Sequence, residues 1–127
     1  MSTDKNSPLQ SANINVIIDG QNFNFSPTQF SGTPAEVRMD TGISTHLIIN
    51  YGKSLAAGTH TLTHTQFKIE FLDDAGRKFT HPVAGTIVVK VLGNTHTGTL
   101  TGVKVDGTGS GAGSQVELSG TYSIVIS

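Results

Sequence analysis

Two histidines, His60 and His64, stand four residues apart in the Thr-rich segment GTHTLTHTQF, which runs from Gly58 to Phe67. In a helix this spacing places both imidazoles on one face, where they can bind a metal ion. Threonine at every second position favours a strand instead, because β-branched side chains prefer extended backbone. In a strand the two rings point the same way but lie about 13 Å apart, whereas a metal–imidazole bond is about 2 Å long. We therefore expect a strand that does not hold a metal by itself.

A metal site would need a further imidazole from a neighbouring strand, and His46, His81 and His96 are the available partners. Their spacing specifies no such site, so we expect no metal and no cofactor. Some aromatic and polar side chains near predicted loops and strand ends are candidates for contacting a ligand instead. These candidate ligand-binding residues are Phe30, His60, His64, His96 and Asp106. Phe30 stands in a polar segment, and we expect it to be exposed while most other phenylalanines lie in the core.

Catalytic motifs are weak in this chain. It contains Ser, His and Asp residues but lacks the Gly-x-Ser-x-Gly turn that exposes a nucleophilic serine. Asp73 and Asp74 are adjacent in a predicted turn and diverge, while Glu70 and Glu117 fall on the wet faces of predicted strands, so no carboxylate pair is arranged for glycoside chemistry. We expect no catalytic residues, and we expect that the protein is not an enzyme.

Composition narrows the classes of partner. The chain has 127 residues, no cysteine and 13% charged residues, about half the charged share of an average globular domain. Disulfides and thiolate metal sites are therefore excluded. The charges are scattered singly and form no basic stripe, so we expect no nucleic-acid partner and no polybasic membrane patch.

The N-terminal segment contains no recognisable targeting signal. Its first apolar run, from Ile14 to Ile18, is too short for a membrane span or for the core of an export signal. We therefore expect no membrane span. The compartment stays open between the cytoplasm and an exported domain that has been trimmed of its signal.

Alternation of apolar and polar residues recurs along the whole chain and predicts an all-β protein. The clearest strands are TQFKIEFL, from Thr65 to Leu72, and VELSGTYSIVI, from Val116 to Ile126. Each predicted strand has one apolar and one polar face. In INVIIDGQNFNF, Asp19 and Gly20 predict the two-residue turn of a hairpin. A parity switch across Gly102 predicts a β-bulge.

Three other segments are less regular. The residues Glu36 to Met39 fit either a short helix capped by Thr33 and begun by Pro34 or a short edge strand. DDAGRKF predicts a turn that contains Gly76. The Gly-rich segment DGTGSGAGSQ, from Asp106 to Gln115, predicts a long mobile loop between the last two strands.

The segments IDGQNFNFS, AAGTHTLTHTQFKIEFLDDAGRKF, VAGTIVV and LSGTYSI follow a recognisable order. A Gly-x-x-Phe hairpin comes first, then a Gly-Thr-x-Thr-Leu strand, an Asp-x-x-Gly turn and closing Gly-Thr-apolar strands. This pattern resembles a family of small bacterial all-β domains, many of them exported or lipid-anchored and of unknown function. The resemblance spans most of residues 14 to 126 and implies the fold; it brings no chemistry to particular residues. The chain lacks the cysteine that accepts a lipid in that family.

We expect a flexible tail over residues 1–12 and one antiparallel β-sandwich of about eight or nine strands over residues 13–127. A small lipocalin-like barrel with an internal pocket is the alternative. The first expected function is a non-catalytic module that binds a glycan or protein through loops or a strand edge. The second is a structural subunit of a surface, fibre or tail that assembles through uncharged edges such as STHLIIN, which Ile43 precedes. The third is a small-molecule carrier.

Overall fold

The computed structural model describes residues 10–42 and 45–126. These residues form ten strands and one short 3-10 turn at Gly109–Gly111. The strands are β1 (Ser11–Ile18), β2 (Gln21–Phe25), β3 (Gln29–Thr33), β4 (Glu36–Asp40), β5 (His46–Asn50), β6 (Gly58–Thr63), β7 (Lys68–Leu72), β8 (Lys78–Leu92), β9 (Thr95–Thr108) and β10 (Gln115–Val125). The all-β prediction is therefore confirmed. Ser11 and Ala12 of the predicted tail belong to β1, and residues 1–9 lie outside the described residues.

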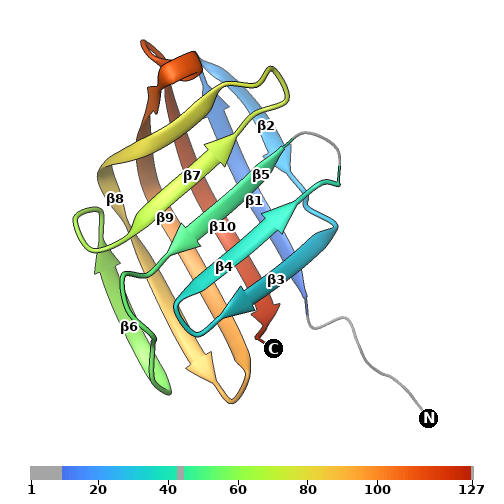
Figure 1. Ribbon diagram of the computed structural model, residues 1–127, viewed down its shortest axis with the longest axis vertical. Coiled ribbons are helices and arrows are strands. Elements are labelled where there is room, and N and C mark those ends of the chain that lie inside the picture. Colours follow the sequence, from blue (N-terminus) through green and yellow to red (C-terminus); the bar gives the residue numbers. More distant parts are fainter. Residues whose placement is uncertain (1–9, 43–44, 127) are drawn as a thin grey trace.

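One antiparallel sheet contains all ten strands and curls into a half-barrel. Its strand order is β2-β1-β10-β9-β8-β7-β5-β4-β3, and β6 pairs with β8 beside this path. In Figure 1, β3, β4, β5 and β7 form a front layer, and β1, β9 and β10 lie behind it. The curl brings β3 against the end of β10, where a Cβ on Gly32 would lie only 2.7 Å from Cδ1 of Ile126.

The long strand β8 connects the two layers. Its first residues, Lys78 and Phe79, pair with β7, whereas the segment from Thr86 to Val91 pairs with β6. The β8–β9 ladder has register shifts between these two parts. Such irregularities bend a strand and increase its twist, so they allow one strand to serve both layers.

Local turn chemistry confirms two predictions. Asp19 and Gly20 have φ angles of 51° and 80°, as the two-residue turn between β1 and β2 requires. Gly102 has a φ of 54°, and the β9–β10 register shifts beside it, between Leu118 and Gly120. This is the bulge that the parity switch in the sequence predicts.

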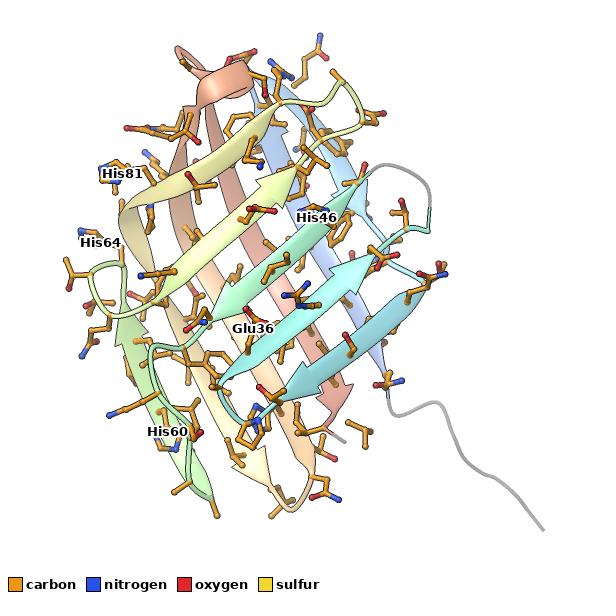
Figure 2. All side chains as sticks on the ribbon, in the orientation of Figure 1. Glu36, His46, His60, His64 and His81 are labelled. Carbon is orange, nitrogen blue, oxygen red and sulfur yellow. The ribbon has the colours of Figure 1, made fainter. Side chains whose placement is uncertain are left out.

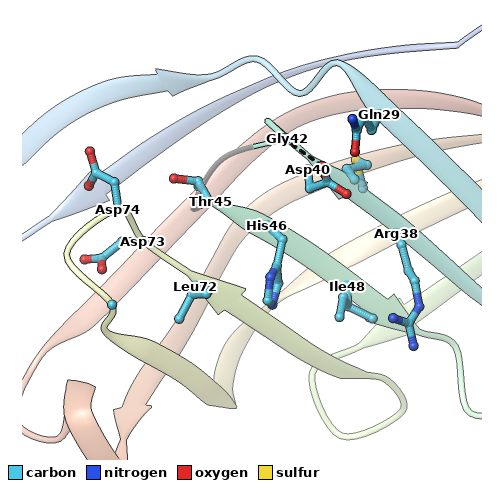
Figure 3. A pocket seen from close by; sticks show the side chains of 12 residues that line it. Gln29, Arg38, Asp40, Gly42, Thr45, His46, Ile48, Leu72, Asp73 and Asp74 are labelled. Atoms are coloured by element: carbon cyan, nitrogen blue, oxygen red, sulfur yellow. Dashed lines mark hydrogen bonds between the residues drawn. The ribbon is translucent and has the colours of Figure 1, made fainter.

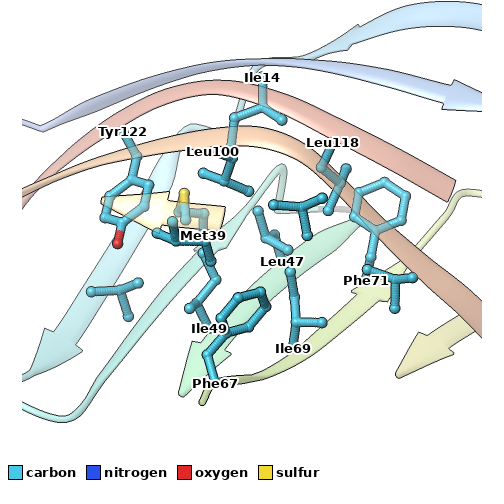
Figure 4. Close-up of a cluster of buried hydrophobic side chains, with 14 of the residues drawn as sticks. Ile14, Met39, Leu47, Ile49, Phe67, Ile69, Phe71, Leu100, Leu118 and Tyr122 are labelled. Carbon is cyan, nitrogen blue, oxygen red and sulfur yellow. The ribbon is translucent and has the colours of Figure 1, made fainter. Parts of the chain in front are cut away.

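The core lies between the two layers and is almost entirely apolar. Inward side chains of the front layer, such as Met39, Leu47 and Phe71, are fully buried, as are Ile14 and Leu118 of the back layer (Figure 4). Burial on this scale is the main stabilising contribution to such a fold. The predicted alternation of VELSGTYSIVI is confirmed, since its inward side chains are buried along β10.

Four local predictions need correction. Residues Glu36 to Met39 form β4, so the helix alternative is wrong. Phe30 is half-buried and packs against the core, whereas Phe23 on β2 is 41% exposed. The segment HLIIN is the interior strand β5, paired on both sides, and not a free edge; Ile43 and Ser44 lie outside the described residues. Thr65 and Gln66 belong to a turn, because β7 begins at Lys68.

The Gly-rich connection is shorter than the sequence predicts. Strand β9 continues to Thr108, and the 3-10 turn that follows packs against β8. Gly111 is buried there, and a Cβ at this position would overlap the backbone oxygen of Lys78. The hydroxyl of Ser110 donates a hydrogen bond of 2.9 Å to the Gly76 carbonyl. Glycine is therefore required at this point for close packing.

A candidate binding face on the outside of the sheet

Three neighbouring strands of the front layer present their polar side chains to solvent as a regular grid. In register, the rows across β4, β5 and β7 are Glu36–Asn50–Lys68, Arg38–Ile48–Glu70 and Asp40–His46–Leu72. The residues between them along each strand, such as Val37, Leu47 and Ile69, are buried in the core. Because successive side chains of a strand point to opposite faces, these nine residues share the outer side of the sheet. We call them the outer face.

Two hydrogen-bonded pairs of side chains lie on the outer face. Nε2 of His46 is 2.7 Å from Oε2 of Glu70 on the diagonal between β5 and β7, and both side chains are about one-third exposed. Nε of Arg38 donates to Oε1 of Glu36 at 3.1 Å along β4. The Arg38 side chain is 57% exposed, so this second pair contributes little to stability. Figure 2 labels Glu36 and His46 on this side of the molecule.

Two open hollows, each of about 550 Å³, lie over this part of the sheet. The first is lined by Asp40, His46 and Leu72 and reaches Asp74 in the β7–β8 turn; Figure 3 shows it from close by. The second lies over Asn50, Lys68 and Glu70 and extends to Thr80, His81 and Pro82 of β8. Arg38 and Ile48 line both hollows. The middle row of the outer face therefore stands between the two hollows.

A buried carboxylate secures the β7–β8 turn beside the first hollow. Asp73 is 2% exposed and accepts hydrogen bonds from the backbone N–H groups of Ala75 and Arg77 and from Nε of Arg77, the last at 2.7 Å. Nη1 of Arg77 also donates to Asp19 in the β1–β2 turn at 2.9 Å. Its hydrogen bonds to Asp73 and then Asp19 raise the pKa of Arg77. The guanidinium therefore joins the turns of the two layers. We call Asp73, Arg77 and Asp19 the turn clamp.

A second polar cluster lies inside the core, at the opposite end of the molecule from the turn clamp. The hydroxyls of Tyr51 and Tyr122 are 2.7 Å apart, and Nδ1 of His96 lies 3.4 Å from the Tyr51 oxygen. The His96 ring stacks on Tyr51 at a centroid distance of 5.7 Å. Gly98 makes room for Tyr122, because a Cβ there would overlap the phenol ring. All three polar side chains are buried and hydrogen-bonded, which is what burial of polar groups requires.

Burial shifts the pKa values of this cluster. It raises the pKa of Tyr51 to about 12, an effect that the bond to Tyr122 partly offsets. It also raises the pKa of Tyr122 and lowers that of His96, to which the nearby His60 adds a smaller lowering. The cluster is thus neutral, and its side chains are hydrogen-bonded to one another within the core.

The five candidate ligand-binding residues lie in different parts of the structure and do not form one site. His96 belongs to the buried cluster, and Phe30 packs against the core from β3. His60 shares the inward face of β6 with Leu62, and its Nε2 lies 2.7 Å from the Ala56 carbonyl oxygen. His64 lies in the turn after β6, and Asp106 on β9 accepts a hydrogen bond from Gln115. Within residues 10–42 and 45–126, no three His, Asp or Glu side chains are grouped closely enough to hold a metal ion.

The sequence does not indicate the outer face as a candidate site, because its residues belong to three segments that become neighbours only in the folded sheet. The sequence pattern places Glu70 on a wet face and indicates His46 only as a possible metal ligand. A usable signal is the distribution of charge. The segments EVRMD and KIEFL carry charged outward residues at close spacing, whereas β9 and β10 place Lys104, Asp106 and Glu117 at one end of their outward side and threonines such as Thr97 and Thr121 farther along it.

Comparison with known proteins adds no family: no family model, no curated protein and no solved structure matches this chain. In the part of the chain that the structure describes, no helix has the length and apolar character that a membrane crossing requires.

Proposed function

We propose that the protein is a non-catalytic interaction module that binds a peptide segment of a protein ligand on the outer face. The observation that supports this proposal is the arrangement of oppositely charged side chains around Ile48 between two open hollows. Hydrogen-bonding groups beside a small apolar patch are what a polypeptide ligand needs for orientation and for burial. Both hollows are open and lined by polar and apolar side chains, which suits an extended segment better than an enclosed small molecule.

Two related alternatives fit the outer face less well. Sugar rings commonly stack on aromatic side chains, yet the described residues that line the two hollows include no Phe, Tyr or Trp. A small-molecule carrier would need a pocket inside the half-barrel. We infer that the curled sheet acts as a sandwich, since apolar side chains of both layers meet in its interior, and we therefore place the ligand outside.

A self-assembling structural subunit is the second candidate function. The strands β2 and β3 stand at the two ends of the sheet, and their sequences, QNFNF and QFSGT, contain no charged residue. Free edges without charge are the feature that most natural sheets avoid, because they pair with other edges. Growth of particle mass beyond a dimer with rising concentration would support this candidate.

Selection of random displayed peptides on the immobilised protein tests the first proposal, with a panel of mono- and disaccharides screened in parallel. We expect enriched peptides to shift backbone amide resonances of β4, β5 and β7. Ile48→Asp should weaken their binding about tenfold, because it places an unpaired charge at the centre of the contact. The matched substitution Thr99→Asp, on the outward side of β9, should leave binding unchanged. Absence of enrichment, or shifts confined to β2 and β3, would contradict the proposal.

A further inference from the structure

On the outer face, side chains of opposite charge lie at equivalent positions on the two sides of β5. Glu36 on β4 and Lys68 on β7 occupy one row, separated by Asn50; Arg38 on β4 and Glu70 on β7 occupy the next, separated by Ile48. In these two rows, each charged position beside β5 therefore has the opposite charge at the equivalent position on the other side. The third row places Asp40 opposite Leu72, and β5 itself contributes His46, Ile48 and Asn50, none of which is an acid or a strong base.

This arrangement has a specific consequence for two copies that meet face to face. A twofold axis that lies in the interface and runs parallel to β5 places β4 of each copy over β7 of the other. Arg38 then faces the second copy's Glu70, and Glu36 faces its Lys68, each contact occurring twice. Ile48 meets Ile48 at the centre. We propose that the outer face binds the same face of a second copy of this chain in this orientation.

The proposal rests on the proposed function, because it uses the same face for binding a protein; the partner is here the folded outer face of a second copy. The competing symmetric orientation is unfavourable. An axis that runs across the strands, along the middle row, places Arg38 over Arg38 and Glu70 over Glu70 and brings Glu36 over Asp40. Like charges in direct opposition raise the free energy of an interface. The axis parallel to β5 avoids every such contact, because only residues of β5 lie on it.

The shape and size of the face predict a weak association. Arg38 and Ile48 border both hollows, so the middle row makes the first contact and water stays in the hollows beside it. The four strands of the front layer, about 4.8 Å apart and each about 17 Å long, outline about 330 Å² per copy. A stable dimer commonly buries about 800 Å² per partner. We therefore expect a reversible dimer that forms at high micromolar concentrations, is weakened by salt and leaves the strand edges free.

Sedimentation equilibrium over a wide concentration range, with reciprocal charge reversals, tests the proposal. Arg38→Glu should weaken the dimer about tenfold or more, because two attractive contacts become repulsive. Glu70→Arg should do the same. An equimolar mixture of the two variants should restore association, since each chain then offers the charge that the other lacks. The matched control Lys90→Glu, at an exposed position of β8 that pairs with β6 and β9, should leave the dimer unchanged.

The contact between Glu36 and the second copy's Lys68 allows an independent test. Glu36→Lys and Lys68→Glu should each weaken the dimer and should complement each other when mixed, while the Arg38–Glu70 contacts stay intact. Thermal denaturation of each variant verifies that it is folded. A protein that stays monomeric throughout, or a dimer that none of the four reversals weakens, would overturn the inference. If peptides still bind the outer face of a monomer, the proposed function survives; if they do not, both proposals fail.

Discussion

At the scale of single residues, His96 makes the stability of this protein depend on pH. Its ring is buried against Tyr51, and burial followed by the charge of His60 lowers its pKa. The folded state therefore binds fewer protons than the unfolded state at acidic pH. The contribution of His96 to stability is complete above the ordinary histidine pKa of about 6.5, and it is lost as the pH falls from there towards the lowered folded-state value.

Urea denaturation between pH 7.5 and 4.5 measures this effect. The free energy of unfolding should fall below about pH 6.5 with a slope of at most about 1.4 kcal/mol per pH unit from this one group. In His96→Phe, which keeps a ring against Tyr51 but cannot titrate, the fall should be smaller by that amount. Identical pH profiles for the two proteins would show that protonation of His96 does not change the free energy of unfolding.

At the scale of elements, the turn clamp holds the β1–β2 and β7–β8 turns together. The Asp73 carboxylate is 2% exposed, and Arg77 is its only charged hydrogen-bond partner among the described residues. Removing the guanidinium leaves a buried charge that has only backbone N–H donors. Losing one partner of a fully buried pair costs about 3–5 kcal/mol, and the partial exposure of Arg77 should reduce this to about 2 kcal/mol.

Two substitutions separate the members of the clamp. Arg77→Met keeps the aliphatic stem and should lower the free energy of unfolding in urea by about 2 kcal/mol. Asp19→Asn removes only the charge of the exposed carboxylate in the β1–β2 turn and should cost less than about 1 kcal/mol. Equal losses would mean that the link between the turns, and not the burial of Asp73, dominates.

Elements defined by local chemistry were predictable from the sequence, whereas those defined by pairing were not. Asp19-Gly20 specifies its hairpin through backbone conformation, and the apolar alternation of β10 specifies its buried face. The segment HLIIN shows the limit: its alternation predicts a strand but does not reveal that β4 and β7 pair on either side of it. The outer face was missed for the same reason, because its rows exist only after three strands separated by loops are in register.

At the scale of the whole molecule, the two ends of the described chain lie on adjacent strands. Ser11 pairs with Ser123 between β1 and β10, and the backbone N–H of Val125 donates a hydrogen bond to the Gln10 side chain. The first strand thus pairs with the last, a contact that spans nearly the full length of the chain. Non-local pairing of this kind slows folding, because the entropic cost of closing the loop precedes the stabilising contacts.

A circular permutant tests whether this pairing limits the folding rate. Residues 10 and 126 are joined by a short Gly/Ser linker, and new termini are opened at Pro27, in the connection between β2 and β3, which do not pair with each other. The β1–β10 pair then becomes a local hairpin while every strand pair is kept. We expect the permutant to refold faster in stopped-flow fluorescence or circular dichroism, with a thermal midpoint within a few degrees of the parent. A control permutant opened at Gly93 separates the long strands β8 and β9, whose pairing is the most extensive in the sheet, and it should refold more slowly. Equal refolding rates for the parent and both permutants would mean that the pairing of the chain ends is not the rate-limiting step.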